Sequence, residues 1–283
     1  MLDNSRLATV KTANFLRKSS KAAALVGVLT LLALAVSCRR GAPPSEPAVD
    51  SGDPATAAVR VAEADKLYAE RSDLSRVRLG IALLRQAQIA DYGNYEAAWK
   101  LAKFNYYLGA HTGDERERDA AFREGIDTGL VAVKLEANKP EGHFWLGANY
   151  GGDAENSTLA GLANVEDIRR EMETVIKLDQ SFEGGSAYLG LGKLYQQAPR
   201  VLGGDNQKAI EYLEKGLRVD SNNAMTRLYL AKAYHAARRD SEAQKQIEGI
   251  RKMTPDPDYL PEYREALDEG NKLSDQISGK ISR

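Results

Sequence analysis

The sequence has only one cysteine and three histidines. A single cysteine cannot form a disulfide within the chain. His111, His143 and His235 lie far apart, and no two of them have the spacing of metal ligands on one helix, so we expect no metal site. No excess of basic residues is present either: 39 Lys and Arg stand against 40 Asp and Glu. A nucleic-acid-binding protein is therefore not indicated.

Catalytic motifs are also lacking. The Gly-Gly pairs occur without the lysine and hydroxyl residue of a phosphate-binding loop. Acidic residues between positions 114 and 119 alternate with arginines, which is typical of a solvated helix start rather than a calcium loop. No nucleophile has a base at motif spacing. We therefore expect neither enzyme activity nor a bound cofactor.

The N-terminus, in contrast, has a targeting pattern. Five Lys and Arg residues precede an apolar run over residues 22–36, which has the length of a signal-peptide core and is short for a bilayer-spanning helix. Residues 35–37 lead directly into Cys38, the chain's one cysteine. This arrangement resembles the lipobox of bacterial lipoproteins, although its leucine, Leu34, lies one place early. The resemblance implies a signal peptide over residues 1–37 and a lipidated Cys38.

Two alternatives to lipidation remain for this segment: a single-pass anchor, and an ordinary secretory signal followed by an incidental cysteine. Residues 39–56 are rich in Pro, Gly, Ser and acidic residues, so we expect residues 38–56 to form a lipidated, flexible tether. Fully extended, the tether would reach about 60 Å. Arg39 stands where an Asp would signal inner-membrane retention in many Gram-negative bacteria. By that resemblance, we expect the protein to face the periplasm from the outer membrane, provided that the organism has one.

Residues 57–283 are predicted to be helical. The octapeptide that begins at Tyr188, YLGLGKLY, places an aromatic residue, Leu-Gly and a second aromatic residue on one helical stripe. Related patterns begin at Trp99, His143 and Arg227. This pattern matches the W-x-x-L-G-x-x-Y signature of tetratricopeptide repeats. We predict an all-α, tetratricopeptide-type solenoid of four to five helix pairs, in which each pair covers the exposed face of the next.

The four patterns begin 44, 45 and 39 residues apart, which is longer than the ideal repeat of about 34. We expect the surplus in two inserted loops, at residues 151–163 and 198–205. In the second, Pro199 should end one helix and Asp205 should cap the next. That insertion is either a plain connection or the rim of a pocket. The C-terminal tail is predicted to add a short capping helix over residues 262–272.

Two segments resemble one family in particular. The run HFWLGANYGG at residues 143–152 and the run APRVLGGD at residues 198–205 are similar to the T-component proteins of TRAP transporters, which are periplasmic lipoproteins of tetratricopeptide type. The likeness covers residues 95–250. It implies a homotrimeric binding module that associates with a periplasmic solute-binding protein and with a small apolar or carboxylate ligand. The alternative is a scaffold lipoprotein that holds envelope proteins together.

The groove of such a solenoid is expected to come from the first helix of each pair. Positions one, five and eight after the first signature residue give the candidate ligand or partner site, whose members include Lys100, Phe104, Tyr107, Phe144, Lys193, Gln196, Lys232 and His235. The first half of this set is aromatic, and the second half is polar with two equivalent lysines. It would suit a molecule with an apolar end and a carboxylate end. Alternatively, the aromatic residues belong to the core and the lysines are simply solvated.

Overall fold

The computed structural model describes residues 53–279, apart from Ser157 and the side chains of residues 157–162. The predicted signal peptide, Cys38 and nearly all of the tether lie outside the described residues. The described part of the chain folds into eleven α-helices and two 3₁₀ helices, without strands. None of these helices has the length and apolar character needed to cross a membrane.

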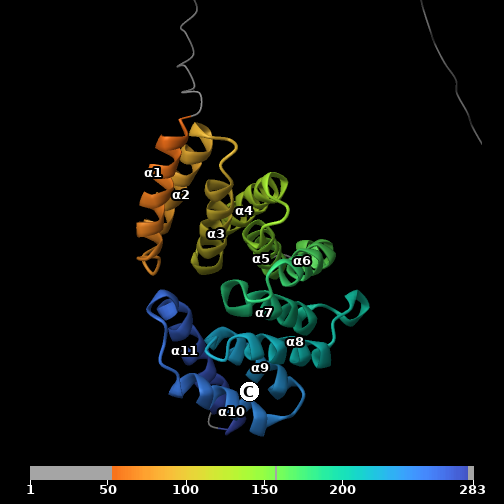
Figure 1. Cartoon of the computed structure of the whole chain (residues 1–283). Helices are drawn as coiled ribbons and strands as arrows, with labels where there is room; N and C mark the ends of the chain where they lie inside the picture. Colours follow the sequence, from red (N-terminus) through yellow and green to blue (C-terminus); the bar gives the residue numbers. More distant parts are fainter. Residues whose placement is uncertain (1–52, 157, 280–283) are drawn as a thin grey trace, which may run out of the picture. The chain divides into compact units, whose positions relative to one another are not determined.

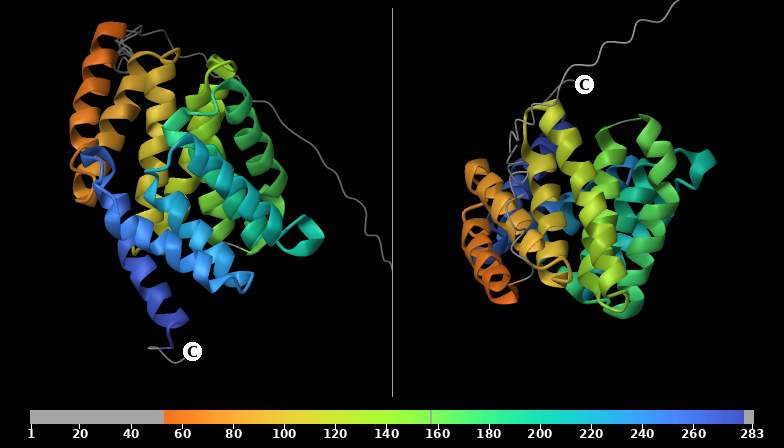
Figure 2. Two further views of the ribbon diagram at one scale, coloured as in Figure 1. Left: turned by 60° about the horizontal axis from the view of Figure 1, so that its bottom comes forward. Right: turned by 90° about the horizontal axis from the view of Figure 1, so that it is seen from above.

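The helices alternate between two rows (Figures 1 and 2). In chain order they are α1 (Pro54–Tyr68), α2 (Leu74–Ala90), α3 (Tyr95–His111), α4 (Glu115–Leu135), α5 (Pro140–Asn156), α6 (Thr158–Leu178), α7 (Phe182–Gln197), η1 (Arg200–Leu202), α8 (Asn206–Val219), α9 (Ala224–Ala236), α10 (Asp240–Lys252), η2 (Pro257–Tyr259) and α11 (Leu260–Ile277). Up to α10, each odd-numbered helix packs against the even-numbered helix that follows it, and each odd-numbered helix also contacts the next odd-numbered one. The odd-numbered helices therefore form the inner row of the curve. This confirms the predicted solenoid of helical hairpins.

Polar caps set several helix starts. Side-chain oxygens of Asp114, Asp205 and Asn223 accept backbone N–H groups in the first turns of α4, α8 and α9. The cap at Asp205 was predicted from the sequence. Helix α1 begins at Pro54, three residues before the expected start, because Asp53 accepts a hydrogen bond from the first turn and proline fits that turn without losing one.

The two insertions differ from each other. The first was expected to be a loop, but α5 continues to Asn156 and α6 begins at Thr158. The added turns of α5 pack closely on α4 because Gly152 leaves room for an aromatic ring: a Cβ there would lie 2.2 Å from Cε1 of Phe122 in α4. The second insertion is a loop, as predicted, and contains η1. Gly203 ends η1 with φ at 93°, a conformation that favours glycine.

The core is divided into successive apolar clusters. Representative members, each no more than 1% exposed, are Phe104 between α1 and α3, Leu191 in α7, Leu213 in α8 and Leu228 in α9. Each cluster is built from helices that are near neighbours in the chain. This is how a repeat solenoid obtains its stability, because each unit buries an apolar face on the next.

Helix α11 caps the array, as predicted. It covers residues 260–277, which is longer than the expected 262–272, and packs against α9 and α10. Tyr263, Leu267 and Ile277 contact buried residues of the last two clusters. The described chain thus contains five helix pairs and one further inner-row helix.

Candidate binding face

The predicted aromatic half of the groove is core. Phe104 is 1% exposed and Tyr107 is 5% exposed. Tyr68 of α1 covers both rings, with centroid separations of 4.7 and 5.8 Å. Phe144 is also buried, and its ring packs edge-on against Phe182 at 5.4 Å. These three aromatic residues therefore belong to the core, which was the alternative interpretation. Neighbouring helices cover the sides of α3 and α5 that the spacing had assigned to the groove.

Two more of the predicted residues are engaged in local ion pairs. Lys100 is 8% exposed, and its Nζ lies 2.6 Å from Asp65 Oδ2 and 2.6 Å from Glu96 Oε1. This pairing joins α3 to α1. His235 is partly exposed near the end of α9, where Nδ1 lies 2.6 Å from Asp240 Oδ1 at the start of α10. Neither residue is presented to the inner face as a free group.

The two equivalent lysines do meet on the inner face. Lys193 of α7 and Lys232 of α9 both lie over the ring of Tyr229, with Nζ 4.9 and 4.7 Å from its centroid. Lys193 Nζ is 2.9 Å from Glu155 Oε1 of α5, and Lys232 is paired with Glu269 of α11. A ligand carboxylate at this place would have to compete with these two glutamates. Gln196, one turn beyond Lys193, is partly exposed.

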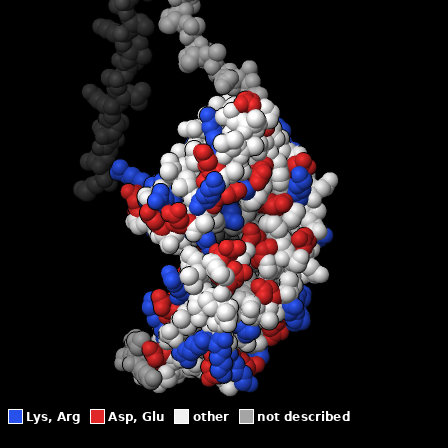
Figure 3. Space-filling view, turned by 60° about the vertical axis from the view of Figure 1, so that its left-hand side comes forward, with Lys and Arg blue, Asp and Glu red and all other residues white. Residues whose placement is uncertain are grey.

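Three further ion pairs cross from one inner element to another. They are Arg71–Glu262 at 2.8 Å, Lys103–Glu183 at 3.7 Å and His111–Glu265 at 3.8 Å. On the side of the molecule shown in Figure 3, basic and acidic side chains are interspersed rather than segregated by sign. The inner face is therefore polar and nearly balanced in charge, which differs from the predicted division into an aromatic half and a cationic half.

The carboxylates of this face were not among the predicted site residues. Glu262, Glu265 and Glu269 are spaced by three and four positions, which places them on one stripe of α11. That spacing is the sequence signal that could have found them. Glu155 and Glu183 carry no comparable signal, because one lies in the insertion that was expected to be a loop and the other precedes a glycine pair.

The electrostatic environment differs among the inner lysines. Burial opposes the charge on Lys193, but Tyr106, Tyr229 and Glu155 outweigh it and raise the pKa of Lys193. Burial lowers the pKa of Lys103, and the distant carboxylate of Glu183 offsets this only in part. Lys103 is therefore the less well compensated of these two cations.

An unpaired donor lies beside Lys103. Trp145 of α5 is 7% exposed, and its indole N–H has no hydrogen-bond acceptor in the described chain. Lys103 Nζ lies 5.2 Å from the Trp145 ring centroid and 4.7 Å from that of Tyr68. Buried N–H groups are normally paired, so this unpaired indole N–H is an exception among the described residues.

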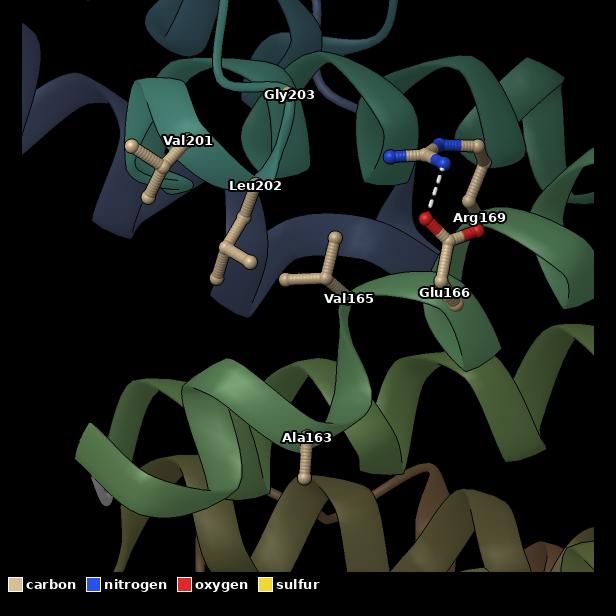
Figure 4. Close-up of a pocket in the computed structure, with 7 residues that line it drawn as sticks. All are labelled: Ala163, Val165, Glu166, Arg169, Val201, Leu202 and Gly203. Atoms are coloured by element: carbon tan, nitrogen blue, oxygen red, sulfur yellow. Dashed lines mark hydrogen bonds and ion pairs between the residues drawn. The ribbon is translucent and has the colours of Figure 1, made fainter.

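An open cavity lies away from this face, between α6 and the second insertion. It has a volume of about 340 Å³ and is lined by Ala163, Val165, Glu166, Arg169, Val201, Leu202 and Gly203. Figure 4 shows Val165 near Leu202, with the Arg169–Glu166 ion pair of 2.6 Å at one side. The second insertion thus forms a cavity rim, the alternative that the sequence left open. The described residues contain no cluster of His, Cys, Asp and Glu that could hold a metal ion.

One comparison with a solved structure supports the fold. A thermophilic TPR protein from Thermus thermophilus aligns with a TM-score of 0.56 and 20% sequence identity, over 75% of this chain and 98% of that one. A MamA protein aligns with a TM-score of 0.46 and 18% identity, over 81% of this chain and 97% of that one. No curated protein matches the sequence.

A family comparison is more specific. The sequence profile described as TRAP transporter T-component matches residues 114–264, which is more than half of the chain. The matched segment includes both runs whose likeness to this family was noted from the sequence, at residues 143–152 and 198–205. We conclude that the chain belongs to the TRAP transporter T-component family.

Proposed function

We propose that this protein is a non-catalytic binding module of a TRAP transport system. In this proposal, lipid on Cys38 holds it in the outer membrane facing the periplasm, and the helical domain associates with a solute-binding protein. Membership of the T-component family and the lipobox-like end of residues 1–37 support this assignment. The family likeness also supports a homotrimer, which sedimentation of the purified chain would test.

The observation that carries the ligand proposal is the pair formed by Trp145 and Lys103. A buried, unpaired N–H beside a poorly compensated ammonium group favours a ligand that brings an oxygen acceptor or a carboxylate. Lys193 and Lys232, each paired with a glutamate, add two further ammonium groups along the same inner row. Apolar area is supplied by the ring of Tyr106, which packs against Trp145, and by the ring of Tyr229, which lies under both lysines. The proposed ligand is therefore a small molecule with an apolar body and an acidic end.

The test is to capture the full chain from its native envelope after mild crosslinking, and to identify bound proteins and small molecules by mass spectrometry. We expect a periplasmic solute-binding protein and an organic acid to be enriched. Recovery of outer-membrane assembly proteins, without a small molecule, would instead favour the scaffold alternative.

Two double variants, one on the inner face and one at exposed positions elsewhere, test whether ligand capture depends on the inner face. The double variant Lys193→Gln and Lys232→Gln should retain at least about tenfold less ligand, since a charged hydrogen bond contributes about 1.5–3 kcal/mol. The control, Lys134→Gln and Lys252→Gln, removes the same charge from exposed positions on α4 and α10. Equal retention by the two double variants would show that Lys193 and Lys232 do not hold the ligand.

A further inference from the structure

The two ends of the solenoid are in direct contact. Repeat units normally touch only their neighbours. Here the turn after α1 meets the start of α11, as Figures 1 and 2 both show. Arg71 Nε lies 3.1 Å from Glu262 Oε1, and Nη2 lies 2.8 Å from Oε2. The same guanidinium also donates to the carbonyl of Asp258.

This contact is geometrically specific. Two parallel N–H to carboxylate bonds form the strongest common arrangement of an arginine ion pair. Arg71 is 5% exposed, and its guanidinium lies 5.0 Å from the Tyr68 ring centroid and 5.8 Å from that of Tyr107. Both ring faces attract the cation. The two rings thus hold the Arg71 guanidinium in position to bind the Glu262 carboxylate of the last helix.

Two further groups of contacts join the same segment to α7 and α3. The hydroxyl of Tyr259 donates to Glu183 Oε2 at 2.7 Å, and Glu183 Oε1 lies 3.7 Å from Lys103 Nζ of α3. The His111 ring stacks on Tyr107 at 4.0 Å, and its Nε2 lies 3.8 Å from Glu265. We call residues 258–265 the strap.

The strap joins the first unit by polar contacts, whereas α11 joins the last units by apolar ones. The buried clusters that include residues of α11 contain no residue of α1, α2 or α3. These contacts join polar and charged groups that water can solvate once they separate, so they can open without unfolding either block. An apolar interface of the same extent would not separate as readily.

Glu183 is held in a strained conformation. Its φ is 48°, and the next two residues, Gly184 and Gly185, have φ of 61° and 74°. A left-handed conformation is unfavourable for a residue with a side chain, and such residues cluster at binding sites and switches. Here the left-handed run at the start of α7 brings the Glu183 carboxylate between Lys103 and the strap.

We propose that the strap is a gate over the inner face, which opens when it releases Arg71 and Glu183 and so regulates access to that face. This proposal rests on the proposed function, because it regulates the same candidate site. In the closed state, Glu183 engages Lys103 and the strap fixes the ends of the inner row together. In the open state, α11 stays packed on α9 and α10 while its first turns leave α1 and α3.

Spin-label distances in the full chain test the gate directly. With Cys38→Ser as background, labels at Glu63→Cys in α1 and Asp268→Cys in α11, both exposed, report the separation of the two ends. We expect one narrow distribution in the parent. Arg71→Met and Glu262→Gln should each add a longer-distance population, and Glu183→Gln should do so to a smaller extent.

A matched control is Arg78→Met, which removes a two-bond ion pair with Glu117 on the outer helices. It should leave the distance distribution unchanged, and helical circular dichroism should be the same in every variant. Unchanged distances in both Arg71→Met and Glu262→Gln would overturn the gate. This readout needs no ligand, so it is separate from the capture experiment: partner recovery with unchanged distances rejects only the gate, and longer distances without any partner reject only the transport proposal.

Discussion

Two regions of the molecule are stabilised by different interactions: the apolar core between the helices, and the polar inner face of the solenoid. Between helices, leucines such as Leu191, Leu213 and Leu228 are completely buried. Across the inner face, ion pairs such as Lys193–Glu155 and Lys232–Glu269 remain partly exposed. Burying one leucine contributes about 1.5–3 kcal/mol, whereas an exposed ion pair contributes about 0–1 kcal/mol. The inner face can therefore change its contacts while the helix pairs stay folded.

The largest effect on unfolding is expected from Leu213→Ala. Leu213 is 0% exposed, and a Cβ on Gly192 would lie 2.4 Å from its Cγ, so the neighbouring helix already approaches as closely as it can. The cavity should not collapse, and we expect a loss of about 3–5 kcal/mol in urea unfolding. Leu178→Ala, at a leucine that is 38% exposed, is the control and should change the free energy by less than about 1 kcal/mol. Similar losses in both variants would mean that the buried layers do not dominate the stability.

A buried ion pair gives the next largest effect. His143 is 8% exposed and Glu171 is 4% exposed, and His143 Nδ1 lies 2.6 Å from Glu171 Oε2. His143 Nε2 lies 3.0 Å from the carbonyl oxygen of Ala137, which can only accept. The charged imidazolium satisfies both partners. His143→Ala should cost about 3 kcal/mol by leaving Glu171 buried beside Arg170 alone, and a loss below about 1 kcal/mol in chemical unfolding would contradict this assignment.

The same pair predicts a pH dependence. The hydrogen bond to Glu171 raises the pKa of His143, while burial opposes the shift. Burial also opposes the charge on Glu171, but hydrogen bonds from His143 and Arg170 outweigh it and lower its pKa. The stability contributed by His143 is thus fully present below its unfolded pKa of about 6.5 and is lost as the pH rises through its folded pKa. The difference in unfolding free energy between the parent and His143→Ala should shrink over that interval.

Substituting a lysine of the inner face should change the free energy of unfolding much less. Lys193→Met removes a cation whose side chain is 23% exposed and leaves Glu155, at 45% exposed, free to be solvated. We expect less than about 1 kcal/mol in unfolding together with a clear loss of captured ligand. Such a result would show that the inner face contributes to binding and not to folding. A loss as large as that of Leu213→Ala would show that the inner face is part of the core.

The smallest effect is expected on the outer surface. Arg78 Nε lies 2.6 Å from Glu117 Oε1, in a pair whose side chains are 47% and 27% exposed. Hydrogen bonds from Arg78 and Thr112 lower the pKa of Glu117 to about 2. Arg78→Ala should cost about 0.5 kcal/mol at neutral pH. The cost should fade in high salt and as the pH falls from about 4.5 towards 2. Salt-independent destabilisation would mean that the arginine stem, not its charge, makes the contribution.

The fold could be predicted from the sequence, because the repeated pattern identifies four of the inner-row helices, α3, α5, α7 and α9, directly. The candidate site could be predicted only in part. Helical spacing says which residues share a stripe, but not which other helix covers that stripe. Phe104 and Tyr107 share the expected stripe, and α1 covers it. Lys193 of α7 and Lys232 of α9 occupy equivalent stripes, which stay on the inner face. Their partners, Glu155 and Glu269, come from segments whose positions depend on the complete curvature of the row.

The Arg71–Glu262 contact also has a mechanical consequence. A row of units linked only to their neighbours deforms like springs in series, so small bends at each joint add up from one end to the other. A link between the two ends acts in parallel with all of those joints, and a displacement of the first unit is then passed straight to the last. With this contact formed, a force applied at one end is transmitted directly to the other end. With the arginine released, each joint absorbs its own share, and the two ends move independently.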